Sequence, residues 1–154
     1  MARPLTPEKA AEFEDLLRFH EHFDQVGWVP PRNPPPDTRA EVARIEAQFG
    51  KSKALLGLRQ ALGDILEMTS SRSPAWVQQF DATCRAAGVK TLSECRVVYW
   101  SKYRRVLERG KIVNHEQFHM LTAIAIASDM ALPLAPAERE LLEAMLEDYE
   151  RRAV

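Results

Sequence analysis

The sequence predicts an all-α protein, for three reasons. No stretch alternates apolar and polar residues between hairpin turns such as Asn-Gly or Asp-Gly. Apolar residues instead recur at spacings of three and four, as they do on one face of a helix. Prolines, glycines and N-capping residues divide the chain into segments of helical length. The 154 residues suffice for one domain with its own core, so we predict a single compact bundle of six or seven helices.

The first helix is predicted from about Pro7 to Gln25. Thr6 is a good N-cap, and proline suits the first helical position. Gly27 ends the helix. The apolar face of this helix comprises Phe13, Leu16, Leu17, Phe19, His20 and Phe23. This surface is too apolar to leave in water, so we expect the helix to pack on the bundle or on another copy of it.

Five of the ten prolines lie within residues 29–37. Proline removes a helical hydrogen bond and favours the extended polyproline II conformation. We therefore predict a stiff strap after the first helix. The corresponding division is an N-terminal helix at 1–28, a Pro-rich linker at 29–37 and a helical bundle domain at 38–154.

Capping and breaking residues delimit the later helices. Gly50, Gly88 and Gly110 each end one, Asn114 caps another, and Pro133 with Pro136 breaks the chain before the last. The predicted helices run over about 38–50, 52–68, 74–88, 91–110, 115–130 and 136–151.

The segment His115-Glu116-Gln117-Phe118-His119 fits the pattern H-E-x-x-H and resembles the zinc-metallopeptidase motif over five residues. Positions i and i+4 lie on one face of a helix, so His115 and His119 could ligate one zinc ion. Glu116 would then be the general base on zinc-bound water. The resemblance implies a zinc-dependent hydrolase, with zinc as its cofactor.

The same residues also fit a buried central helix without a metal or cofactor, which we favour. The cap at Asn114 would place the positive end of the helix dipole beside the proposed zinc ion, which is unfavourable. On this interpretation His119 is a packed or interface imidazole with a hydrogen-bond partner. His20 and His22 diverge on a helix, so they cannot grip one ion together, and both are expected at the surface.

The segment 96–111 is basic and aromatic. On a helix, Lys102, Arg105 and Arg109 form a stripe at spacings of three and four. Such a stripe suits a nucleic-acid backbone, but it can also pair with acids. Residues 51–131 carry a net charge of +5, and each flanking end carries −3, so we favour pairing with the terminal helices. The candidate partner-binding residues are Tyr99, Trp100, Lys102, Tyr103, Arg105 and Arg109.

Residues 84–98 resemble a helix-turn-helix motif. Cys84 is a small residue four positions before Gly88, a Gly-Val turn follows, and Arg-Val-Val lies in the second helix. Glu94 stands where the motif has an apolar residue, and the predicted second helix continues for about 17 residues. The resemblance implies binding to nucleic acid. A plain helix–Gly–helix corner explains the same residues.

The sequence favours a non-enzymatic partner-binding or regulatory protein in the cytoplasm. It contains no G-x-S-x-G, P-loop or Rossmann glycine pattern. The start lacks an apolar signal core, and no run of 18 apolar residues is present, so no membrane partner is expected. The expected partner is another protein or a second copy of this chain. The alternatives are a nucleic-acid-binding regulator using helix 96–111 and the zinc hydrolase.

Overall fold

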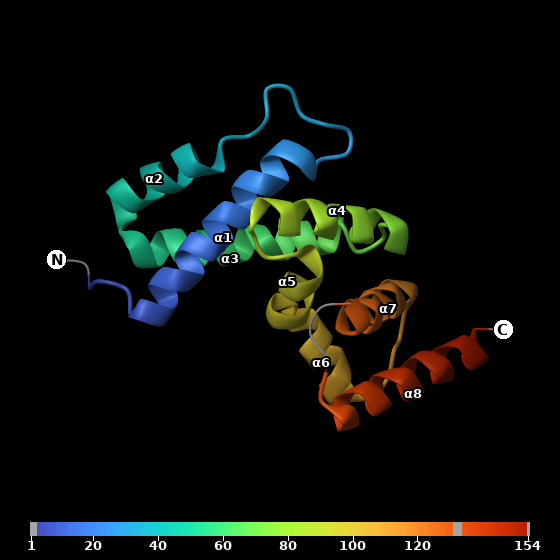
Figure 1. The fold of residues 1–154 in the computed structure, drawn as a ribbon. Coiled ribbons are helices and arrows are strands. Elements are labelled where there is room, and N and C mark those ends of the chain that lie inside the picture. Colours follow the sequence, from blue (N-terminus) through green and yellow to red (C-terminus); the bar gives the residue numbers. More distant parts are fainter. Residues whose placement is uncertain (1–2, 131–133, 154) are drawn as a thin grey trace. The chain divides into compact units, whose positions relative to one another are not determined.

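The computed structural model describes residues 3–130 and 134–153, which form eight α-helices and no strand (Figure 1). The predicted all-α class is confirmed. Pro133, predicted to help break the chain, lies outside the described residues. The helices are α1 (Pro7–Val26), α2 (Thr38–Phe49), α3 (Lys51–Met68), α4 (Pro74–Ala87), α5 (Leu92–Tyr99), α6 (Ser101–Arg109), α7 (His115–Met130) and α8 (Pro136–Arg152).

The described residues hold eight helices, where six or seven were predicted, because segment 91–110 forms two helices. The break falls at Trp100, whose ψ of 84° lies outside the helical region. Its side chain is only 5% exposed. Burial of the indole at a bend therefore replaces the glycine or proline that usually marks a break.

The chain divides into two compact units. Unit 1 comprises Met1–Ile65 with Phe80–Thr91, and unit 2 comprises Leu66–Gln79 with Leu92–Val154. The dividing points fall within α3, within α4 and directly before α5, and none falls in the Pro-rich segment 29–37. Each unit has its own buried apolar residues.

Helix α1 lies in the core of unit 1, as its apolar face predicted. Thr6 Oγ1 accepts a hydrogen bond from Lys9 N at 3.3 Å, which confirms the N-cap. The rings of Phe19 and Phe23 lie 6.2 and 5.7 Å from the Phe80 ring, both in edge-to-face geometry. All members of the predicted apolar face are buried: Phe13, Leu16, Leu17, Phe19, His20 and Phe23.

The Pro-rich segment contains no helix, and both of its ends are held at the last turns of α1. Trp28 Nε1 donates to Asp24 Oδ1 at 3.5 Å, and Thr38 N donates to Asp24 Oδ2 at 3.2 Å. The guanidinium carbon of Arg32 lies 3.9 Å from the Trp28 ring centroid. A strap over the rest of the chain stays a prediction.

The expectation that His20 lies at the surface is wrong. It is 3% exposed, and its Nε2 lies 3.1 Å from the Leu58 carbonyl oxygen. His22, half-buried, lies with Nε2 2.9 Å from Thr83 Oγ1. The reason is helical spacing, because His20 is one turn from both Leu16 and Phe23 on the core face. Burial lowers the pKa of His20, opposed by the Leu58 carbonyl and by Asp24, and burial also lowers the pKa of His22.

Helix α7 is the central helix of unit 2, as predicted, since it contacts α5, α6 and α8. Its buried apolar residues are Met120, Leu121, Ala123, Ile124 and Ala127. Arg139 of α8 donates to the Ala125 carbonyl oxygen at 3.0 Å and to Asp129 Oδ1 at 2.8 Å, which ties α8 to α7. Across residues 3–130 and 134–153, no helix has the length and apolar character needed to cross a membrane.

Candidate functional site

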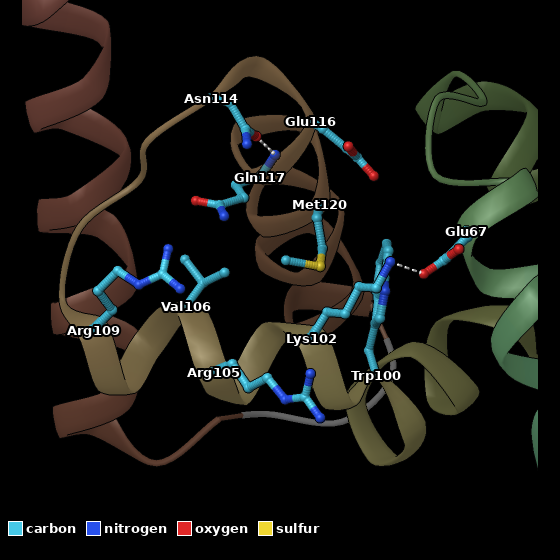
Figure 2. Close-up of a pocket in the computed structure, with 10 residues that line it drawn as sticks. All are labelled: Glu67, Trp100, Lys102, Arg105, Val106, Arg109, Asn114, Glu116, Gln117 and Met120. Atoms are coloured by element: carbon cyan, nitrogen blue, oxygen red, sulfur yellow. Dashed lines mark hydrogen bonds and ion pairs between the residues drawn. The ribbon is translucent and has the colours of Figure 1, made fainter.

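Unit 2 contains a pocket of about 250 Å³, which we call the α6–α7 pocket. Figure 2 shows Val106, Met120 and Trp100 directed toward the space between the two helices. All three side chains are buried, so they form an apolar floor. The polar rim of the pocket comprises Glu67, Lys102, Arg105, Arg109, Asn114, Glu116 and Gln117.

Helical spacing on α6 determines which residues reach this pocket. Lys102, Arg105 and Arg109 share one side of the helix, and Val106 lies beside them toward the floor. Tyr103 points elsewhere: it is 2% exposed, and its hydroxyl donates to Glu138 Oε1 at 2.9 Å. Burial, together with Glu138, raises the pKa of Tyr103. Tyr99 is half-buried in α5. Four of the six predicted partner-binding residues therefore line the pocket, and the two tyrosines do not.

The first turn of α7 forms the opposite edge of the pocket. Asn114 Oδ1 accepts from Gln117 N at 2.9 Å, which confirms the predicted cap. Gln117 Oε1 in turn accepts from Val113 N at 3.0 Å. These two hydrogen bonds hold the start of α7 in place, and Met120 follows one turn later on the floor.

The charge on the rim is only partly balanced. Lys102 forms an ion pair with Glu67, at the end of α3, and this carboxylate raises the pKa of Lys102. Within the part of the chain that the structure describes, Arg105 and Arg109 form no ion pair. Within unit 2, the described residues show no ion pair between the stripe and α8, and pairing with the N-terminal helix stays a prediction. The physical reason in unit 2 is that α8 reaches α6 at Tyr103, on a different face from the stripe.

The indole N–H of Trp100 is a buried donor in the pocket lining. Nε1 has no hydrogen-bond partner among the described residues. A buried donor without an acceptor costs about 1–3 kcal/mol, and such groups are rare in folded proteins. The pocket therefore combines an apolar floor, two guanidinium groups without an ion pair among the described residues, and a buried N–H donor.

The residues of the H-E-x-x-H segment face different surroundings. Glu116 lines the α6–α7 pocket, whereas His119 lines another pocket of unit 2. His115 lies near Phe118 and Tyr149, with ring centroids 6.1 and 6.5 Å away. The rings of His115 and His119 lie 4.5 Å apart, and the described residues contain no group of three His, Cys, Asp or Glu able to hold a metal ion. A zinc site stays a prediction.

His119 is exposed, so its imidazole is not packed inside unit 2, and its place in an interface stays a prediction. The core face of α7 runs through Met120, Leu121 and Ile124, and it leaves His119 at its edge. The helix is nevertheless central in unit 2.

The helix-turn-helix segment begins with a helix end of the expected kind. Gly88 has φ of +70°, a conformation that favours glycine, and Val89 N donates to the Cys84 carbonyl oxygen at 3.0 Å. The following helix, α5, ends at Tyr99 after eight residues. The predicted long second helix is therefore wrong, and the cations Lys102, Arg105 and Arg109 lie on a separate helix.

Comparison with protein-family models, with curated proteins and with solved structures found no match.

Proposed function

We propose that this chain is a non-enzymatic binding module whose α6–α7 pocket receives an apolar side chain from an acidic segment of a partner protein. One observation supports the proposal above the others: a buried floor of Trp100, Val106 and Met120 lies beside a rim with two arginines that form no ion pair within residues 3–130 and 134–153. Interface anchors are typically single side chains that fill such pockets, ringed by polar groups.

The size of the pocket favours one anchoring side chain. Its volume of about 250 Å³ is below the range of about 300–1,000 Å³ that is typical of small-molecule sites. Burial of a leucine or phenylalanine contributes about 1.5–3 kcal/mol. One anchor with a few exposed charges therefore gives weak, reversible binding, as expected of a regulatory contact.

The positive charges on the rim favour a partner segment with acidic residues beside its apolar anchor. Arg105 and Arg109 can each donate two hydrogen bonds to one carboxylate. The Trp100 indole N–H provides a further donor near the floor. Exposed ion pairs contribute less than about 1 kcal/mol each, so the cations act mainly on partner choice and association rate.

Two exposed arginines also favour a nucleic acid as the runner-up partner. Glu67 and Glu116 lie on the same rim, and their carboxylates oppose a phosphate backbone and an acidic peptide alike, so the rim charges do not separate the two partners. Among the described lining residues Trp100 is the one aromatic side chain, so they offer no row of rings on which successive bases could stack. An acidic protein segment fits both the floor and the rim.

Selection from a random peptide library on the immobilised protein tests this proposal. We expect enrichment of one sequence pattern, in which a Leu, Ile, Met or Phe is flanked by two or more Asp or Glu residues. The physical reason is that only this combination satisfies both the apolar floor and the unpaired guanidinium groups. Sequencing before and after selection measures the enrichment.

The same selection on the Arg105→Glu, Arg109→Glu variant is the control, and it should lose the acidic pattern. Absence of any enriched pattern on the wild-type protein would contradict the proposal, as would a pattern that the variant retains. A titration with random-sequence DNA and RNA at low salt distinguishes a nucleic-acid partner from a protein partner. A nucleic acid would replace the protein partner if two results are found. The logarithm of the association constant would fall with log salt at a slope of about −2 to −3, and binding would be lost in the Lys102→Ala, Arg105→Ala, Arg109→Ala variant.

A further inference from the structure

A second pocket of unit 2, about 200 Å³ in volume, lies beside the loop that joins α3 to α4. We call it the loop pocket. Its lining includes the loop residues Ser70–Ser73, Arg96 from α5, and His119 and Thr122 from α7. Two guanidinium groups, an imidazole and several hydroxyls therefore surround the space. None of the described lining residues is an Asp or Glu.

The loop is held by its own hydrogen bonds. Ser70 N donates to the Glu67 carbonyl oxygen at 3.2 Å, and Arg72 N donates to the Thr69 carbonyl oxygen at 3.1 Å. Ser73 Oγ accepts from Trp76 N at 3.1 Å and so caps α4. These turns leave the exposed Ser71 at the mouth of the loop pocket.

Both guanidinium groups are fixed in place. Arg96 is 2% exposed, and its Nη2 donates to the Thr69 carbonyl oxygen at 2.8 Å, which holds the charge against the loop backbone. The Arg72 guanidinium lies 5.5 Å from the Trp76 ring centroid. Its Nε is buried and has no hydrogen-bond partner among the described residues. A buried guanidinium N–H without an acceptor is a donor ready for an anion.

We infer that the loop pocket binds the dianion of a phosphate monoester. Guanidinium forks match the geometry of phosphate oxygens, and the hydroxyls of Ser71 and Ser73 can donate to the remaining ones. Pro74, Ala123 and Ile126 form an apolar wall of the same pocket, which suits the carbon side of the ester. A space of about 200 Å³ admits a phosphoryl group with a few carbon atoms, but not a nucleotide. This site is independent of the α6–α7 pocket and of the partner proposed for it.

Titration of the full chain with inorganic phosphate, glycerol 3-phosphate and N-acetyl-phosphoserine amide tests the inference. Binding is monitored through the NMR signals of the His119 ring. We expect the His119 signals to shift saturably with each anion. The two monoesters should bind more tightly than inorganic phosphate, because only they contact the apolar wall. Tighter binding of glycerol 3-phosphate indicates a small-molecule ester, and tighter binding of the phosphoserine compound indicates a phosphorylated side chain.

Arg72→Gln is expected to weaken binding of each anion about tenfold or more, because a hydrogen bond to a charged group is lost. Ser71→Glu should abolish it by placing a carboxylate at the mouth, and Ser71 is exposed, so this variant removes no core contact. Arg151→Gln, at an exposed position in α8 outside the pocket, is the matched control and should bind as the wild type does. The inference fails if no anion shifts His119 at millimolar concentration, or if Ser71→Glu and Arg151→Gln bind equally well.

Discussion

Replacing Arg105 and Arg109 together with glutamate is expected to weaken binding of an acidic, leucine-anchored peptide by about 30-fold. Each substitution removes an exposed attraction of about 0.5 kcal/mol and adds a repulsion of similar size, so the two together cost about 2 kcal/mol. Both arginines line the α6–α7 pocket and have no ion pair among the described residues. Isothermal titration at low and physiological salt measures the change, which should be larger at low salt.

The matched control carries the same change in charge outside the pocket. Arg104→Glu with Lys111→Glu alters two exposed cations that do not line it, so binding of the peptide should change little. A peptide in which lysines replace the acids should bind the Arg105→Glu, Arg109→Glu variant better than it binds the wild type. Equal loss of affinity in the two double variants would mean that only the overall charge matters, and the assigned pocket would be wrong.

The stability of the protein is expected to fall as the pH decreases below about 6.5, because of His20. Burial lowers the pKa of His20 below the ordinary value of 6.5 that it has in the unfolded chain. The unfolded chain therefore binds the proton first, and stability is lost from pH 6.5 downward until the folded pKa is reached. The loss from this residue approaches about 1.4 kcal/mol per pH unit. Urea unfolding at pH 5 to 8 measures it.

His20→Gln should flatten this pH dependence, since an amide keeps a donor for the Leu58 carbonyl oxygen but does not titrate. His115→Gln, at an exposed position in α7, is the control and should keep the wild-type slope. His22 contributes in the same direction, because burial lowers its pKa too. An identical slope in wild type and His20→Gln would show that His20 is not responsible.

The helices whose starts the sequence predicted well are those that begin with common capping residues. Thr6 and Pro7 start α1, and Asn114 starts α7, with the capping hydrogen bonds that their residue types favour. The break at Trp100 could not be predicted in the same way. No proline or glycine marks it, and its cause is tertiary burial of the indole, which no local pattern reports.

The candidate site was predicted in part. Helical spacing identified Lys102, Arg105 and Arg109 as one stripe, and they do line one pocket. Spacing alone could not show that Tyr103 is turned into the core, because a long aromatic side chain fits a core as well as an interface. Glu67 lies on a different helix, 35 residues before Lys102, and no sequence signal links the two.

Val106 and Met120 were also missed as pocket residues, although each lies at a regular apolar position of its helix. An apolar residue in the periodic pattern is expected in the core, and only the packing of α6 beside α7 shows that these two border an open space. The loop pocket was missed because its residues come from the α3–α4 loop, α5 and α7. Such a site depends on tertiary packing and has no local motif.

The indole N–H resonance of Trp100 tests the central claim most directly. Nε1 of Trp100 is buried in the lining of the α6–α7 pocket without a partner among the described residues. In the protein labelled with ¹⁵N-tryptophan, addition of the selected acidic peptide should shift this resonance saturably, and those of Trp28 and Trp76 should stay in place. Tryptophan-to-phenylalanine variants assign the three signals. A peptide that binds without shifting Trp100, or a lysine-flanked peptide that shifts it equally, would contradict the account.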